Sequence, residues 1–67
     1  MDIYEFRYEK EDTKILKRIE YTNKINIAYI EIIEIKVNDK WEVRQIVIPI
    51  YEQDFKSLIN IYKMKKI

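Results

Sequence analysis

Apolar and polar residues alternate at the start of the chain, between Ile3 and Glu9. This period of two predicts a half-buried strand with Tyr4, Phe6 and Tyr8 on one side. After a charged turn, residues 14–22 fit two patterns. One is a strand with Ile15, Ile19 and Tyr21 on one face, and the other is a short helix that Thr13 would cap. We favour the strand because Tyr21 falls on the strand face and outside the helical stripe.

Two longer segments, residues 25–37 and 41–50, are dense in β-branched side chains, which favour strands over helices. The apolar phase shifts between odd and even positions in both, so we expect a bulge or apolar contacts on both sheet faces. Asn38 and Asp39 tolerate a left-handed backbone and predict a tight hairpin turn. Pro49 has no amide hydrogen, so it is expected where the second strand ends.

Apolar residues then recur at helical spacing, which predicts an amphipathic helix from Tyr51 to about Lys65. The stripe consists of Tyr51, Phe55, Leu58, Ile59 and Tyr62. Acidic residues in the first turn (Glu52, Asp54) and lysines in the last (Lys63, Lys65, Lys66) would complement the helix dipole. The predicted fold class is α+β, a four-stranded antiparallel meander sheet followed by one C-terminal amphipathic helix (ββββα). One helix covers one face of such a sheet, so we expect a partner on the second.

The chain has 67 residues and no cysteine, so residues 1–67 should form a single small domain whose core is marginal without further support. We therefore expect a homodimer. Lys plus Arg (13) and Asp plus Glu (12) nearly cancel, so a nucleic-acid site would have to be a local basic patch. With no signal sequence and no apolar run long enough to span a bilayer, we expect a cytoplasmic protein without a membrane partner.

Catalytic chemistry has few candidate residues in this sequence. Histidine and cysteine are absent, and Ser57 has no partner for nucleophilic catalysis. Glu31 and Glu34 fall on opposite faces of a strand, so they do not form an acid-base pair. We expect no enzyme, no cofactor and no metal site.

Aromatic and basic residues suggest a binding surface instead. Trp41 follows the hairpin turn, where its ring could stack on bases, and cations near it in sequence could meet phosphates. The candidate nucleic-acid-binding residues are Trp41, Arg44, Lys36, Lys40, Arg7, Tyr4 and Tyr8. The alternative is structural: the aromatic rings pack under the helix or over the end of the sheet, and the cations are a solvated face.

Two segments resemble the PUR-type repeat, the purine-rich-element-binding module, and its Whirly and positive-cofactor-four relatives. The first is the strand Tyr29-Ile30-Glu31-Ile32-Ile33-Glu34. The second is Ile48-Pro49-Ile50-Tyr51-Glu52-Gln53-Asp54-Phe55-Lys56-Ser57-Leu58, a strand that runs into a helix. The resemblance covers a little over half the chain. It implies a ββββα fold, dimers, and single-stranded DNA or RNA bound on the sheet face.

These observations predict a non-enzymatic, single-stranded nucleic-acid-binding module that acts as a homodimer. A second hypothesis comes from a different class: a small protein-binding inhibitor or adaptor, of the type that viruses and mobile elements encode, which occludes a host protein. Short length, balanced charge and the lack of catalytic residues fit both.

Overall fold

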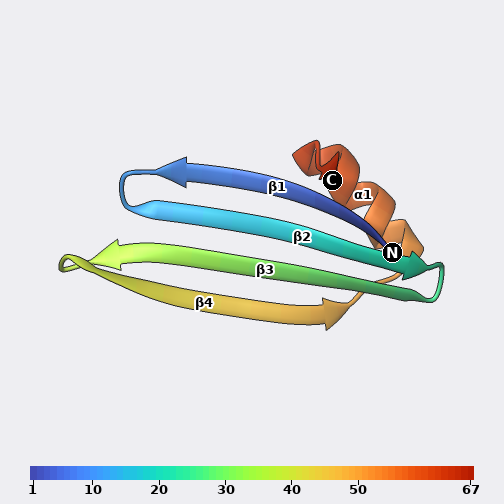
Figure 1. Ribbon diagram of the computed structural model, residues 1–67, viewed down its shortest axis with the longest axis horizontal. Helices are drawn as coiled ribbons and strands as arrows, with labels where there is room; N and C mark the ends of the chain where they lie inside the picture. The colour runs from blue at the N-terminus through green and yellow to red at the C-terminus, as the bar shows by residue number, and fades with distance from the viewer.

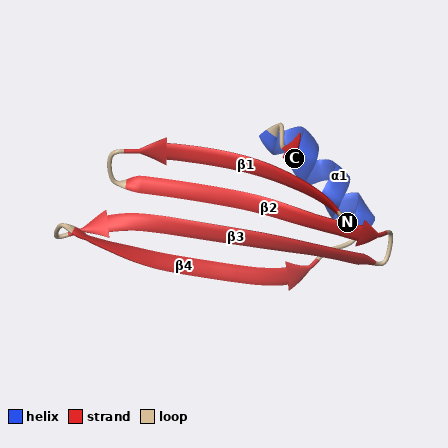
Figure 2. Cartoon of the chain, viewed as in Figure 1, coloured by secondary structure: helices blue, strands red, loops and turns tan.

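The structure, a computed structural model, describes all residues from Met1 to Ile67. The elements are β1 (Asp2–Lys10), β2 (Thr13–Asn23), β3 (Asn26–Val37), β4 (Lys40–Pro49), α1 (Glu52–Tyr62) and β5 (Lys65–Lys66). Strands β1 to β4 form an antiparallel meander, and the complete sheet has the order β4-β3-β2-β1-β5 (Figure 1). The predicted α+β fold is confirmed, and the ambiguous segment 14–22 is a strand. Short turns join the four long strands (Figure 2).

The turn between β3 and β4 has the two-residue geometry that the sequence predicts. Val37 pairs with Lys40, which leaves Asn38 and Asp39 as the turn residues. Their φ angles are 51° and 64°. Positive φ at both positions is the property of a type I′ turn, whose twist matches that of the flanking strands. Asn and Asp meet this requirement in a chain that contains no glycine.

Apolar residues lie on both faces of the sheet, and β3 contains no bulge. Its pairing with β4 is continuous from Ala28 to Val37, and its only register shift with β2 lies between Tyr21 and Asn23. Paired residues share a face. The helix-side face includes the row Tyr4, Ile19, Tyr29 and Ile48, and the opposite, open face includes the row Glu5, Arg18, Ile30 and Val47. The phase shifts in the sequence therefore reflect apolar contacts on both faces.

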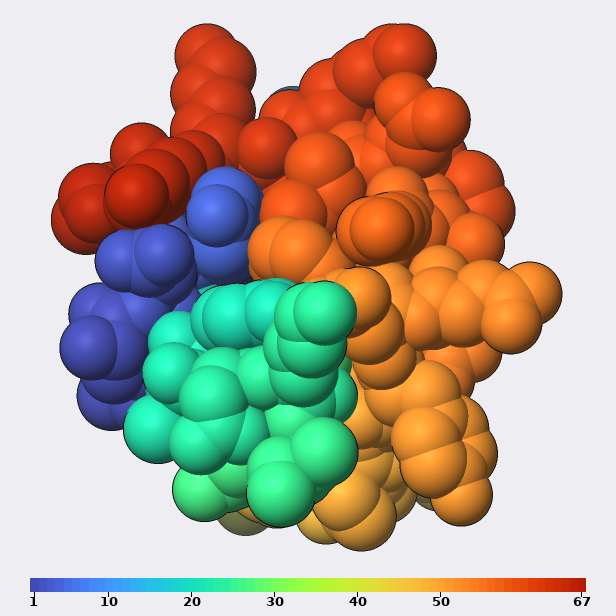
Figure 3. Space-filling view, turned by 90° about the vertical axis from the view of Figure 1, so that its right-hand side faces the viewer, coloured from blue at the N-terminus to red at the C-terminus, as the bar shows by residue number.

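Helix α1 covers the end of the sheet that carries the β2–β3 turn, where the C-terminal segment also packs against β1 (Figures 1 and 3). The side chains buried there are Ile19, Ile27, Tyr29 and Met64. The helix adds Phe55, Leu58, Ile59 and Tyr62, as the apolar stripe predicts. The ring of Phe55 lies 5.2 Å from that of Tyr4 and 4.7 Å from that of Tyr21. Tyr51 is the exception, because it precedes the helix and is 82% exposed.

The helix ends at Tyr62, so the prediction that it continues to Lys65 is wrong. Lys63 has a left-handed backbone with φ 53°, and the amide of Met64 donates to the carbonyl of Ile59 at 3.2 Å. This bond stops the helix and turns Met64 into the core, after which Lys65 and Lys66 pair with β1 as β5. The last helical turn has no basic residue, because Lys63 is the C-cap and Lys65 and Lys66 belong to β5, so the prediction that these lysines occupy that turn is also wrong.

Beyond the helix, the four strands continue as a part that we call the distal arm, residues 7–17 and 31–46. It makes the molecule long, 42 Å against 20 and 17 Å in the other directions. Large apolar side chains are 40–57% exposed on both faces of this arm. They are Tyr8, Ile35, Val37 and Ile46 on the helix-side face, and Trp41 and Val43 on the open face.

Candidate nucleic-acid interface

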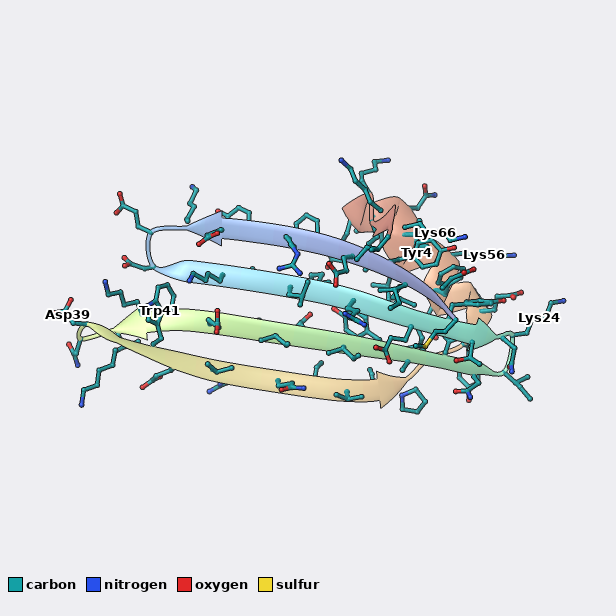
Figure 4. All side chains as sticks on the ribbon, viewed as in Figure 1. Tyr4, Lys24, Asp39, Trp41, Lys56 and Lys66 are labelled. Atoms are coloured by element: carbon teal, nitrogen blue, oxygen red, sulfur yellow. The ribbon has the colours of Figure 1, made fainter.

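The seven candidate binding residues lie on two different faces of the sheet. Trp41, Lys36 and Arg7 lie on the open face, because Trp41 pairs with Lys36 and Arg7 belongs to the row of Leu16. The helix-side face carries Tyr4, Tyr8, Lys40 and Arg44. Figure 4 also places Trp41 and Tyr4 at opposite ends of the molecule. The structure therefore does not bring the seven residues together as one site.

Tyr4 is part of the hydrophobic core. Its ring packs edge-on against Phe55 beneath α1, at 5.2 Å between ring centroids. The neighbouring ring of Phe6 likewise packs against Tyr62, at 5.6 Å. For these two rings the structural alternative holds, because both are partly buried and pack against α1. Tyr8 lies beyond the helix and is 40% exposed, but on the side opposite Trp41.

Trp41 and two lysines make a small cluster on the open face of the distal arm. The indole is 40% exposed, and the ammonium of Lys14 lies 4.7 Å from its ring centroid. Lys36 is directly opposite Trp41 across the β3–β4 ladder and forms no salt bridge. Sequence reasoning missed Lys14, because only the register between β2 and β3 brings it near Trp41. The cluster offers one aromatic surface and two cations.

The open face over β1 and β2 is a network of ion pairs. Glu5 accepts from Arg7 at 3.2 Å and from Arg18 at 3.3 Å, and Arg18 also pairs with Glu20 at 3.1 Å. Lys14 lies 3.8 Å from Glu9. These carboxylates neutralise cations that could otherwise meet phosphates. Among the candidate cations, Lys36, Lys40 and Arg44 remain without a salt bridge.

A polar cluster closes the core on the helix-side face, where α1 ends. Lys17 donates to Glu31 at 2.5 Å and to the Tyr29 hydroxyl at 3.2 Å, and the Tyr29 hydroxyl donates to Glu31 at 2.5 Å. The ammonium of Lys17 also lies 4.6 Å from the ring centroid of Tyr62. No fully buried polar atom of the cluster lacks a hydrogen-bond partner, and the contacts hold Lys17 at the edge of the core.

The same contacts shift the pKa values of the three groups. Burial opposes the charge of Lys17, but its hydrogen bonds to Glu31 and Tyr29 outweigh burial and raise its pKa above 10.5. The hydrogen bond from Lys17 lowers the pKa of the Glu31 carboxyl below 4.5. Burial, together with the hydrogen bond to Glu31, raises the pKa of the Tyr29 hydroxyl. Each group is therefore held in its ordinary neutral-pH form.

Comparison with models of protein families, with curated proteins and with solved structures found no match. Helix α1 lacks the length and the apolar composition to cross a bilayer. No group of three or more His, Cys, Asp or Glu side chains converges as a metal site.

Proposed function

We propose that this chain is a non-enzymatic, single-stranded nucleic-acid-binding module that acts as a homodimer. The observation that carries the proposal is the cluster on the open face: a partly exposed Trp41 with Lys14 4.7 Å from its ring and the unpaired Lys36 opposite it. Base stacking on an aromatic ring is worth about 1–3 kcal/mol, and lysines add a salt-sensitive phosphate term. The resemblance to PUR-type repeats supports the same type of ligand.

The proposed site is narrower than the set of residues that the sequence suggests. Trp41 stacks on a base, and Lys36 and Lys14, which follow it across the sheet on β3 and β2, contact phosphates. Lys14 does so by exchanging its contact with Glu9, at 3.8 Å, for the phosphate. Arg7 lies on the same face, where displacement of its bond to Glu5 would free it for a further phosphate. Tyr8, Lys40 and Arg44 face the other way, so they take no part in this site.

Titration of a fluorescent poly-dT or poly-U oligomer at low and moderate salt tests the proposal. Trp41→Ala should weaken binding by about one stacking contribution, which is about 5- to 150-fold in Kd. Its melting temperature should change little, since the ring is 40% exposed. Val47→Ala is the matched control, because Val47 lies on the same face but outside the cluster. Absence of binding at both salt concentrations would remove this function.

A second candidate, the protein-binding inhibitor or adaptor, is favoured by the ion pairs of the open face. Arg7, Lys14 and Arg18 each already contact a glutamate, so this face has a balanced charge that suits a protein partner as well as a polyanion. A pull-down from nuclease-treated host lysate separates the two functions. One stoichiometric protein that survives nuclease supports the adaptor, and loss of all captured material supports nucleic-acid binding.

The homodimer is supported by how little of this chain is buried. Only 4 of 67 residues are buried, and the distal arm exposes large apolar side chains on both faces. Exposed apolar area of this kind marks interaction surfaces in soluble proteins. A chain of this length also gains stability from a second subunit when it has no disulfide.

A further inference from the structure

The two edges of the sheet are protected to different degrees. On the β1 side, the short strand β5, which consists of Lys65 and Lys66, covers the edge only at Tyr4 and Glu5, so residues 6–10 of β1 stay uncovered. Short strands and lysines are common devices that prevent edge-to-edge association. On the other side, β4 is ten residues long, exposed throughout, and has no neighbour. Only β4 therefore offers an edge that is free along its whole length.

The hydrogen bonds between β3 and β4 determine which backbone groups of β4 are free. The amide of Ile50 donates to the carbonyl of Ile27 at 3.0 Å, which makes this a hydrogen-bonded pair. Such pairs alternate along an antiparallel ladder, so the even-numbered residues of β4 bond to β3. The free edge thus presents the backbone groups of Trp41, Val43, Gln45 and Val47. Pro49 follows at the end of the strand and has no amide hydrogen.

Two opposite charges on β4 have no partner within the chain. Glu42 and Arg44 lie on the helix-side face, and their cross-strand neighbours on β3 are Ile35 and Ile33. Neither forms a salt bridge. They flank Val43, which is 57% exposed on the open face. An antiparallel second copy presents the same segment in reverse order. If the two copies pair at Val43, the negative charge of each copy therefore lies opposite the positive charge of the other.

We propose that β4 pairs with β4 of a second copy of this chain, antiparallel, with the two-fold axis at Val43. This register places Glu42 opposite Arg44 of the partner subunit, and the symmetry repeats the pair. Moving the axis to residue 44 would oppose two arginines, and moving it to residue 42 would oppose two glutamates. The free groups of residues 41, 43 and 45 would form about six backbone hydrogen bonds, and Pro49 lies outside the paired stretch.

This interface rests on the homodimer proposed above; it buries the β4 edge of the distal arm and leaves the two faces of the arm exposed. Helix α1 lies over β1 and β2 at the other end of the molecule, so it does not obstruct the edge near Val43 (Figure 1). The two sheets would become continuous, with both Trp41 side chains on the same open face. Each Trp41 would lie opposite Gln45 of the partner subunit. A single strand of nucleic acid could then cross the two-fold axis and reach both tryptophans.

A cysteine cross-link tests the position of the axis, because the chain contains no cysteine of its own. Residues opposite each other at the axis have Cα atoms about 5.5 Å apart, within the range of a disulfide. Val43→Cys should therefore give a disulfide-linked dimer on mild oxidation. Val47→Cys is the matched control, since it is on the same face and similarly exposed, at 59%. It should stay monomeric on a non-reducing gel, and equal cross-linking of both variants would overturn the proposal.

A charge exchange tests the ion pairs independently. Glu42→Arg or Arg44→Glu alone replaces two attractive pairs by two repulsive ones, and should raise the dimer Kd at least about tenfold. The double variant restores both pairs with reversed direction and should recover dimerisation. Circular dichroism checks that each variant is folded. A dimer that is insensitive to the single substitutions would place the interface elsewhere. Both experiments measure dimerisation without an oligonucleotide. A negative result would therefore contradict the β4 interface and not the proposed nucleic-acid binding, whereas a negative oligonucleotide titration would contradict the binding and not the interface.

Discussion

At the scale of single residues, Lys17, Tyr29 and Glu31 make the stability of the fold depend on pH. Because folding lowers the pKa of Glu31, its contribution is present above 4.5 and is lost as the pH falls through the folded pKa. Because folding raises the pKa of Lys17, its contribution is present below 10.5 and is lost as the pH rises through the folded pKa. We expect thermal melts to show lower melting temperatures at both ends of the pH scale.

Glu31→Gln should flatten the acid side of this profile, because the amide does not titrate. Its melting temperature at neutral pH should also fall, since Lys17 would lose its counter-charge at a half-buried position. Glu34→Gln is the control, because Glu34 lies on β3 but forms no salt bridge. An unchanged acid side in Glu31→Gln would mean that Glu31 does not pair with Lys17 in solution.

At the scale of elements, the end of α1 depends on a strained residue. Lys63 has φ 53° in a position where glycine is usual, and an L-amino acid with a side chain loses about 1–2 kcal/mol in this conformation. Glycine has no such strain in the folded state. It also makes the unfolded chain more flexible, which lowers the free energy of unfolding by about 0.5–1 kcal/mol. We expect Lys63→Gly to raise the free energy of unfolding by about 0.5–1 kcal/mol, measured by urea denaturation.

The same substitution at Lys56 is the control for this prediction. Lys56 lies inside α1 and is exposed, with a weak contact to Glu52 at 3.9 Å. Glycine inside a helix costs about 1 kcal/mol relative to good helix formers, so Lys56→Gly should lower the free energy of unfolding. Destabilisation of similar size in both variants would contradict the left-handed end of the helix at Lys63.

At the scale of the whole molecule, the exposed distal arm predicts that stability depends on protein concentration. A dimer that forms only from folded subunits stabilises the fold by mass action, so the melting temperature should rise as the concentration increases. Light scattering at tens of micromolar should give the mass of a dimer, twice the 8.4 kDa of the chain. A monomer at that concentration, with a melting temperature independent of concentration, would contradict the homodimer.

The order of the four long strands and the helix, and the local geometry of the sheet, could be predicted from the sequence, whereas the short strand β5 could not. The alternation around Phe6, the Asn38-Asp39 turn and the strand end at Pro49 are all found where the sequence predicts them. The core role of Tyr4 and Phe6 was one of two open alternatives. These features could be predicted because backbone preference and side-chain period depend on residues a few positions apart.

The end of the helix and the set of side chains that share a face depend on contacts between residues far apart in the sequence. Lys63 adopts a left-handed backbone where the buried Met64 turns into the core, a contact made with strands far away in sequence. The register of β2 on β3 brings Lys14 to Trp41, and the alternation of the strands sends Arg44 to the other face. Both outcomes depend on long-range pairing, in which a shift of one residue would exchange every side chain between the two faces.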